Sequence, residues 1–195
     1  TKKTSLYFPT SKGDVMKILI LGQGGREHAF VKALKRTTAD SEIHVFPGND
    51  GMKSEALCFT DKSLSDTSFI EKLCADNRYD FIFIGPEDPL VNGVSDHLRN
   101  LGFNIVVPSQ HWAQLEGSQI FAKEFMIKAK IPTAEYVLVE SVDQVKQHIQ
   151  QFTAPYVLKA DGLAAGKGVF ICDTPEELYT AAENIFEKKT LGSAG

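Results

Sequence analysis

Residues 159–169, KADGLAAGKGV, have the composition of a loop that can surround phosphate groups. Their glycines and alanines carry little side-chain bulk, so backbone N–H groups can approach phosphate oxygens. Lys159 and Lys167 can supply positive charge to the same group. The segment therefore indicates nucleotide chemistry, and the alternative is a flexible glycine-rich hairpin with two surface lysines.

This segment does not have the spacing of a Walker A loop, G-x-x-x-x-G-K-[ST]. Gly162 lies only four positions before Gly166, and Lys167 is followed by Gly168 where a hydroxyl residue would hold magnesium. A strand, not a helix, is also expected after the loop. A P-loop enzyme is therefore excluded.

A second glycine cluster, Gly22, Gly24 and Gly25, lies where backbone amides and a helix dipole would favour a phosphate. A dinucleotide fingerprint would need glycine at position 27, which is Glu27, and an acid after the second strand, which ends at Pro47. The sequence therefore argues against a nicotinamide enzyme.

Three charged side chains nearby could also do chemistry. Arg26 can hold a phosphate through two hydrogen bonds, although residues 26–28 could equally be an ordinary polar first helical turn. Glu87 could accept from a ribose hydroxyl or an amine, and the alternative is helix-end electrostatics beside Asp88. Lys123, taken alone, would be a solvated helix lysine, and His111 and His148 receive no role.

The elements that position these groups alternate between short apolar runs and amphipathic stretches. Strands are predicted at 17–21, 42–46, 81–84 and 103–107. One helix is predicted at 26–36, and a second behind a cap at Ser65 or Asp66, where Phe69, Ile70, Leu73 and Cys74 repeat at helical spacing. A third is predicted from a cap at Asp88, with Val91, Val94, Leu98 and Leu101 on one face. This alternation predicts an open parallel α/β sheet whose ligands bind at the carboxyl ends of the strands.

The pattern changes after position 108. Helices are predicted at 109–116 and 118–129, the second with Ile120, Phe121, Phe125 and Ala129 on one face, and a strand at 136–139. Capping boxes at Ser141 and Thr174 predict two further helices, and strands at 156–160 and 169–172 flank the glycine loop.

Six motifs in order resemble those of the phosphoribosylamine-glycine ligases, members of the ATP-grasp superfamily. They are GGREH at 24–28, PGN at 47–49, GPEDPLVNG at 85–93, QLEGS at 114–118, KIPTAEY at 130–136 and LKADGLAAGKGV at 158–169. The resemblance covers residues 16–195. One departure is Val107, where the family often has glycine before the proline.

The resemblance implies an α/β fold class, with a Rossmann-like pre-ATP-grasp sheet followed by an incomplete α+β ATP-grasp lid subdomain. Residues 1–15 are expected to be an appendage or tag, and 16–108 the N-terminal domain. Residues 109–134 are then a helical connector belonging to the ATP-grasp domain, and 135–195 are the lid subdomain.

The resemblance also implies two sets of ligand contacts and no catalytic side chain. The residues expected to bind ATP are Lys123, Lys159, Asp161, Gly162, Leu163, Ala164, Ala165, Gly166, Lys167 and Gly168. Those expected to bind phosphoribosylamine are Gly24, Gly25, Arg26, Glu27, His28, Pro47, Gly48, Asn49, Gly85, Pro86, Glu87, Pro89 and Leu90.

The implied reaction joins glycine to 5-phosphoribosylamine, with ATP giving ADP and phosphate by way of a glycyl phosphate. It uses Mg²⁺ or Mn²⁺, whose ligands we expect to lie outside this sequence. Because the chemistry consists mainly of positioning and charge neutralisation, we expect the 195-residue chain alone to lack ligase activity.

The composition limits which classes of binding partner and which cellular locations we expect. A net charge of -4 offers no broad basic surface for nucleic acid, and no stretch reaches the length of a membrane span. Three widely spaced cysteines suit reduced core thiols. We therefore expect a cytoplasmic monomer acting on small molecules.

Two other interpretations stay open at this point. One is a different ATP-grasp enzyme, such as a carboxylase or a related purine ligase, which would share the lid loop but not GGREH and GPEDPL together. The other is a non-enzymatic nucleotide-binding or interaction module.

Overall fold

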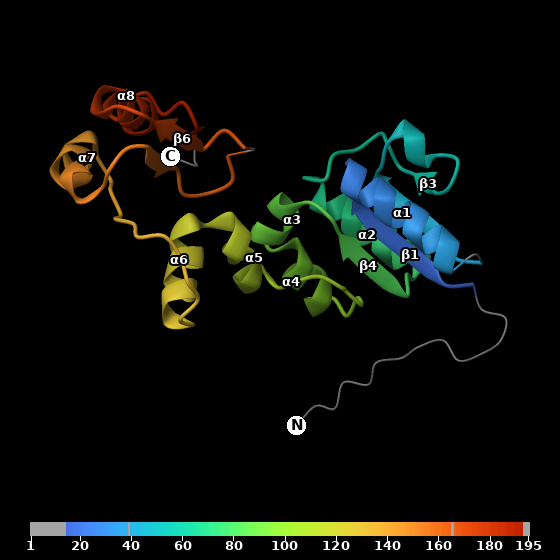
Figure 1. Ribbon diagram of the computed structural model, residues 1–195. Coiled ribbons are helices and arrows are strands. Elements are labelled where there is room, and N and C mark those ends of the chain that lie inside the picture. The colour runs from blue at the N-terminus through green and yellow to red at the C-terminus, as the bar shows by residue number, and fades with distance from the viewer. Residues whose placement is uncertain (1–14, 39, 165, 193–195) are drawn as a thin grey trace. The chain divides into compact units, whose positions relative to one another are not determined.

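The computed structural model describes residues 15–38, 40–164 and 166–192, and the chain forms two compact units, Thr1–Gln110 and His111–Gly195. Figure 1 shows the helices and strands of both. Residues 1–14 of the predicted appendage and Ala165 of the glycine loop lie outside the described residues.

Unit 1 is built on a parallel sheet with strand order β3-β2-β1-β4. Its strands are β1 (Lys17–Gly22), β2 (Glu42–Pro47), β3 (Leu57–Cys58) and β4 (Phe81–Ile84). β1 is central, since Ile18 pairs with Ile43 of β2 on one side and with Phe81 of β4 on the other. All four strands run in one direction, so their carboxyl ends meet at one edge.

Both faces of this sheet are covered by packed side chains. Successive side chains of β1 point to opposite sides of the sheet, and both sets lie in buried clusters. Ile18 and Ile20 pack with Val31 on one face, and Leu19 and Leu21 pack with the second helix layer on the other. Full burial of such a side chain contributes about 1.5–3 kcal/mol. The layers are formed by α1 (Gly25–Thr37), η1 (Asp50–Met52), α2 (Thr67–Asn77), α3 (Glu87–Val91) and α4 (Val94–Asn100).

Three local expectations in unit 1 need correction. The single helix predicted from Asp88 is divided into α3 and α4, because Gly93 between them has φ 84° and caps the second helix from a left-handed conformation. Leu101 then follows α4 and is 51% exposed, not buried. The strand predicted at 103–107 is reduced to one parallel bridge between Ile105 and Ile82.

Unit 2 contains α5 (Gln110–Gly117), whose first residue closes unit 1, and α6 (Gln119–Lys128). These are followed by α7 (Val142–His148), η2 (Ile149–Gln151), β5 (Tyr156–Lys159), β6 (Val169–Cys172) and α8 (Pro175–Phe186). β5 and β6 are antiparallel. Their inner face packs on α7 and α8 through Val145, Cys172, Leu178 and Ala182.

The helix starts of unit 2 follow their sequence signals. Ser141 accepts a hydrogen bond from the Gln144 amide, and Thr174 accepts one from the Glu177 amide, so both predicted caps are confirmed. The strand predicted at 136–139 is wrong, because this segment has no sheet partner among the described residues.

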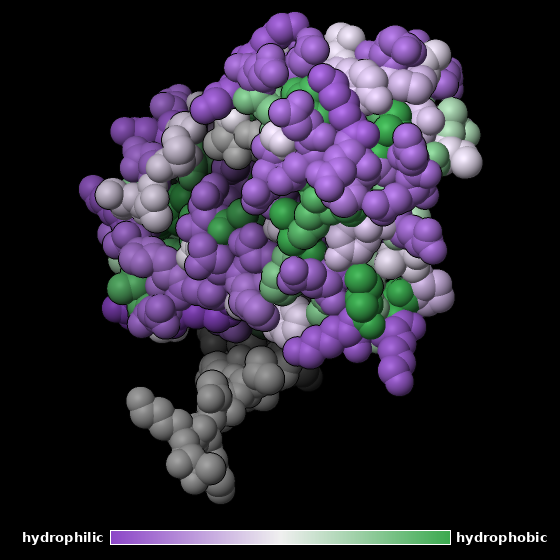
Figure 2. Space-filling view, turned by 90° about the vertical axis from the view of Figure 1, so that its left-hand side faces the viewer, coloured by the Kyte–Doolittle hydropathy of each residue, from purple (hydrophilic) through white to green (hydrophobic). Residues whose placement is uncertain are grey.

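On the face displayed in Figure 2, hydrophobic side chains lie among hydrophilic ones.

Candidate functional site

The buried carboxylate of Glu27 lies at the carboxyl edge of the unit 1 sheet. Glu27 is 3% exposed, and its Oε2 accepts a 2.6 Å hydrogen bond from the amide of Gly24, the N-cap residue of α1. A Cβ on Gly22 would lie 2.7 Å from Glu27 Cδ, and one on Gly85 would lie 2.6 Å from the same atom. These glycines therefore leave the volume that the glutamate fills between the loops after β1 and β4.

A charged pair lies at the same edge. Arg26 Nη2 is 3.0 Å from Glu87 Oε2, so the helix start after β1 is joined to the start of α3 after β4. The pKa of Glu87 lies below its usual value, first because its own backbone amide donates to the carboxylate and then because of Arg26. The guanidinium is mostly exposed, so it can also meet an anion from solvent.

The loop after β2 is bonded to the loop after β1. Asn49 Nδ2 donates to the Gln23 carbonyl at 2.8 Å, and the Gly48 amide donates to the Gly22 carbonyl at 3.0 Å. His28 lies behind this loop, with Nε2 3.9 Å from Glu55 Oε1. The structure thus places the predicted residues of the first two loops side by side.

The predicted residues after β4 differ in their exposure. Pro86 precedes α3 as its N-cap residue and Glu87 is partly exposed, whereas Pro89 is buried. Leu90 packs against the core cluster that contains Leu98. Pro89 and Leu90 consequently support the loop from behind, and Glu87 presents its carboxylate at the surface.

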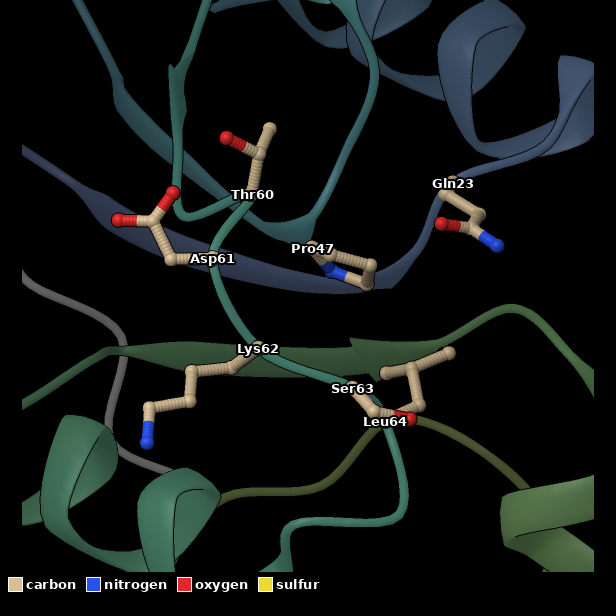
Figure 3. Close-up of a pocket in the computed structure, with 7 residues that line it drawn as sticks. All are labelled: Gln23, Pro47, Thr60, Asp61, Lys62, Ser63 and Leu64. Carbon is tan, nitrogen blue, oxygen red and sulfur yellow. The ribbon is translucent and has the colours of Figure 1, made fainter.

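A cavity of about 380 Å³ lies at this edge, next to Pro47. Figure 3 shows Pro47 between Gln23 on one side and Thr60 and Asp61 on the other. Residues 60–64, in the connection from β3 to α2, complete the lining. Sequence reasoning did not nominate Gln23 or residues 60–64; the available signal was a polar run, TDKS, placed soon after an apolar segment.

The glycine loop of unit 2 joins β5 to β6. The Ala160 amide donates to the Gly168 carbonyl at 2.8 Å and the Lys167 amide to the Ala164 carbonyl at 2.9 Å. Asp161 turns back to α6, where it accepts from the Ser118 hydroxyl at 3.0 Å and the Ile120 amide at 3.1 Å. Its carboxylate thereby fixes one end of the loop to a helix start.

The remaining described positions of the loop differ in their exposure. Gly162, Leu163 and Ala164 are partly exposed, Gly166 and Lys167 are exposed, and Gly168 is buried. A Cβ on Gly168 would lie 2.7 Å from that of Ala164, so this turn leaves no room for a side chain. The part of the loop nearest its tip is thus the part open to a ligand.

One face of the β5–β6 pair is apolar and exposed. Val157, Val169 and Ile171 are 53%, 52% and 72% exposed, and Lys159 stands opposite Val169 in the register. Because strand side chains alternate between faces, these four residues share the side away from α7 and α8. A lysine beside an apolar surface next to a glycine loop suits the phosphates and the base of a nucleotide.

Lys123 is held within unit 2. Its Nζ donates to Thr133 Oγ1 at 2.7 Å and to the Ala134 carbonyl at 2.9 Å, and it lies 5.2 Å from the centre of the Tyr136 ring. The KIPTAEY segment thus fixes the position of this ammonium group, which sequence reasoning had assigned to the nucleotide.

Two family models match the chain in succession. The N domain of phosphoribosylglycinamide synthetase matches residues 16–116, and the ATP-grasp (A) domain of the same enzyme matches residues 117–195. The chain belongs to the phosphoribosylglycinamide synthetase family. This agrees with the motif resemblance and with the α/β fold followed by a partial ATP-grasp domain.

Relatives in the phosphoribosylglycinamide synthetase family are similar over nearly the whole chain. A phosphoribosylamine-glycine ligase of Leptospira interrogans is 40% identical over 181 residues, 92% of this chain and 42% of the relative. A crystal structure of the Thermotoga maritima ligase has 33% identity and a TM-score of 0.75, covering 92% of this chain and 42% of that one. The chain thus spans less than half the length of these relatives.

A more distant structure shares the fold alone. The N5-carboxyaminoimidazole synthetase of Staphylococcus aureus complexed with ADP has 19% identity and a TM-score of 0.72.

The ATP-grasp (A) domain implies a nucleotide and a divalent cation. Lys159, Lys167 and the glycine loop fit the nucleotide phosphates. Within residues 15–38, 40–164 and 166–192, no group of three or more His, Cys, Asp or Glu side chains could hold a metal ion. The same residues contain no helix long and apolar enough to cross a membrane.

Proposed function

We propose that the protein acts in de novo purine biosynthesis as a phosphoribosylamine-glycine ligase, in the cytoplasm and as a monomer. ATP, glycine and 5-phosphoribosylamine would give ADP, phosphate and glycinamide ribonucleotide. The observation that carries this proposal is the succession of two domains of one family along a single chain.

We assign the sugar-phosphate substrate to the strand-end loops of unit 1. Arg26 is an exposed cation suited to a phosphate, Glu87 is an ionised acceptor suited to an amine or hydroxyl, and Asn49 lies in the loop between β2 and β3. The buried Glu27, with Gly24, holds these loops in position and is assigned a positioning role.

We assign the nucleotide to the β5–β6 face and the glycine loop. Lys159 and Lys167 would contact its phosphates through their ammonium groups, with backbone N–H groups of residues 162–164 and of Gly166 closing over them. The apolar surface of Val157, Val169 and Ile171 would take the base. Lys123 would contribute charge from the position that Thr133 fixes.

The reaction needs positioning and no protein nucleophile. A carboxylate oxygen of glycine bonds to the terminal phosphorus of ATP as the bond to ADP breaks. The amine of phosphoribosylamine then attacks the acyl carbon, phosphate departs, and the nitrogen loses a proton. Bound Mg²⁺ or Mn²⁺ would neutralise phosphate charge, and the residues of this chain would orient the reactants and exclude water.

The sugar-phosphate assignment is tested by titrating the 195-residue chain with ribose 5-phosphate, which lacks the reactive amine. Amide NMR signals of the loops after β1, β2 and β4 should shift. Arg26→Ala should weaken binding by about 10- to 100-fold, the loss expected for a hydrogen bond to a charged group. Arg36→Ala, at the exposed far end of the same helix, is the control. Equal affinity of the two variants contradicts the assignment.

The nucleotide assignment has its own test. Lys159→Met should weaken ATP binding measured by calorimetry, whereas Lys128→Met, an exposed lysine at the end of α6, should not. Unchanged ATP affinity in Lys159→Met would reject the phosphate role of this lysine.

A further inference from the structure

The carboxylate of Asp161 supplies the anion at the start of α6. Its Oδ1 accepts from the Ser118 hydroxyl at 3.0 Å and from the Ile120 amide at 3.1 Å. The Ser118 hydroxyl in turn accepts from the Phe121 amide at 3.0 Å. Two amides of the first helical turn are thus joined to one carboxylate, one directly and one through a hydroxyl. Unpaired amides and the positive end of the helix dipole favour an anion at this position.

The negative charge of Asp161 is therefore directed to the helix and not to a ligand of the loop. Like charges repel, so a carboxylate in contact with a polyphosphate would lower the affinity for it. Its neighbours suit that contact better, because Lys159 before it and Lys167 after it are exposed cations. Gly162 has φ 99°, so the chain turns immediately after Asp161. The carboxylate belongs to the connection between the loop and the helix.

The helix held by Asp161 also carries Lys123. Lys123 lies three residues after Ile120, about 4.5 Å further along the helix axis. Its ammonium group donates to Thr133 Oγ1 and to the Ala134 carbonyl. α6 is thus bonded to the glycine loop at its start and to the segment after the helix through this lysine. Because the two positions are one turn apart on one helix, a displacement of the helix start also moves Lys123.

We propose that Asp161 is a positioning residue for the nucleotide. By holding the start of α6 against the glycine loop, it sets the distance between Lys123 and the lysines of that loop. Cations on two segments can meet one polyphosphate together only if the segments keep a fixed separation. The inference rests on the proposed function, because this separation matters only if the nucleotide phosphates lie among these lysines. Asp161 acts without touching the nucleotide, in place of the ATP contact that the motif resemblance implies.

The ATP affinity of three variants of the 195-residue chain, measured by calorimetry, distinguishes positioning from direct contact. Asp161→Ala loses both bonds to α6 and should weaken ATP binding by about three- to tenfold, as for residues coupled in one network. Asp161→Asn keeps an acceptor oxygen for both donors and removes the charge, so it should retain the wild-type affinity. Asp143→Ala is the control, since it removes an exposed carboxylate from the first turn of α7. Equal weakening by Asp161→Ala and Asp161→Asn would indicate direct contact of the charge and overturn the inference.

A second substitution tests whether Asp161 acts through Lys123. In a chain that carries Lys123→Met, Asp161→Ala should have little further effect on ATP affinity, because the group that it positions is gone. Effects that multiply as for independent sites would overturn the inference. Amide NMR signals of β6 and α8 report whether unit 2 is folded. If Asp161→Ala unfolds it, Ser118→Ala, which leaves the Ile120 bond in place, takes its part in both comparisons.

The outcomes separate this inference from the proposed function. If ATP binds the wild type and Lys159→Met weakens it while Asp161→Ala retains full affinity, the inference is overturned and the proposed function stands. If ATP does not bind the wild type, both are overturned.

Discussion

Replacing Gly85 by alanine tests how tightly the loops of unit 1 are fitted around Glu27. The added Cβ would lie 2.6 Å from Glu27 Cδ and 2.7 Å from Cγ, whereas carbon atoms in contact prefer about 3.5–4.0 Å. Glu27 cannot withdraw freely, because Gly24 holds its Oε2 and Gly22 packs against the same side chain. The methyl group must therefore move a loop or break that hydrogen bond.

The expected cost follows from these two routes. Overpacking costs about 1–3 kcal/mol, and losing a hydrogen bond to a charged group costs about 1.5–3 kcal/mol. We expect Gly85→Ala to lower the unfolding free energy of unit 1 by about 2–4 kcal/mol. Amide exchange of Leu19 and Ile20 in β1 measures this loss, and the fluorescence of Trp112 reports on unit 2 in the same sample.

Two further variants distinguish the contact from a general effect of alanine. Gly25→Ala places its methyl group in open space in the first turn of α1, so it should be neutral or stabilising by up to about 1 kcal/mol. Adding Gly85→Ala to Glu27→Ala should cost much less than adding it to the wild type, with a coupling energy of about 1–3 kcal/mol. Additive effects, or a Gly85→Ala loss below about 0.5 kcal/mol, refute the reasoning.

Three other predictions concern single side chains. Burial lowers the pKa of His44 against an opposing effect of Glu42, so the folded ring binds fewer protons than the unfolded one. The contribution of the neutral ring to the unfolding free energy is therefore fully present above pH 6.5 and is lost as the pH falls through the folded pKa. His44→Gln should flatten the profile of unfolding free energy between pH 7.5 and 5, and parallel profiles of the variant and the wild type would contradict this. Thr133→Val should weaken ATP binding by a few-fold and Thr133→Ser should restore it, since the hydroxyl accepts from Lys123; calorimetry in which Thr133→Val matches the wild type would exclude this positioning role. Burial raises the pKa of Cys74 to about 12, so iodoacetamide at pH 8 should label it only after unfolding, as measured by mass spectrometry; labelling of the native chain at the rate of a free thiol would count against this.

Elements with a long or strongly apolar pattern were predictable from sequence. The cores of β1 and β4 are uninterrupted apolar runs, and β2 has Ile43, Val45 and Phe46 around His44. The caps at Asp66, Ser141 and Thr174 are local hydrogen-bond patterns. β3 was missed because it has only two residues, one of them exposed, and owes its existence to pairing with Val45 and His44. The division of the next helix was missed because the apolar pattern continues across Gly93, whose φ of 84° begins a new helix there.

The sequence predicted which loops form the candidate site, but not the role that each side chain has in it. Motif spacing identified the strand ends, but Glu27 could not be recognised as buried without knowing that Gly85 lies beside it. Lys123 likewise gave no sign in sequence that Thr133 and Ala134 hold its ammonium group, because those residues lie in a segment without regular structure. Roles of this kind depend on contacts between segments far apart in the chain.

The bond from Asp161 to the start of α6 also has a consequence during protein synthesis. Ser118 caps this helix locally, but the Ile120 amide receives its acceptor from a residue 41 positions later. At about 5–20 residues per second, a ribosome needs about 2–8 s to add that length. For this interval α6 has only its local cap, and its first turn reaches its final hydrogen bonding when the glycine loop emerges.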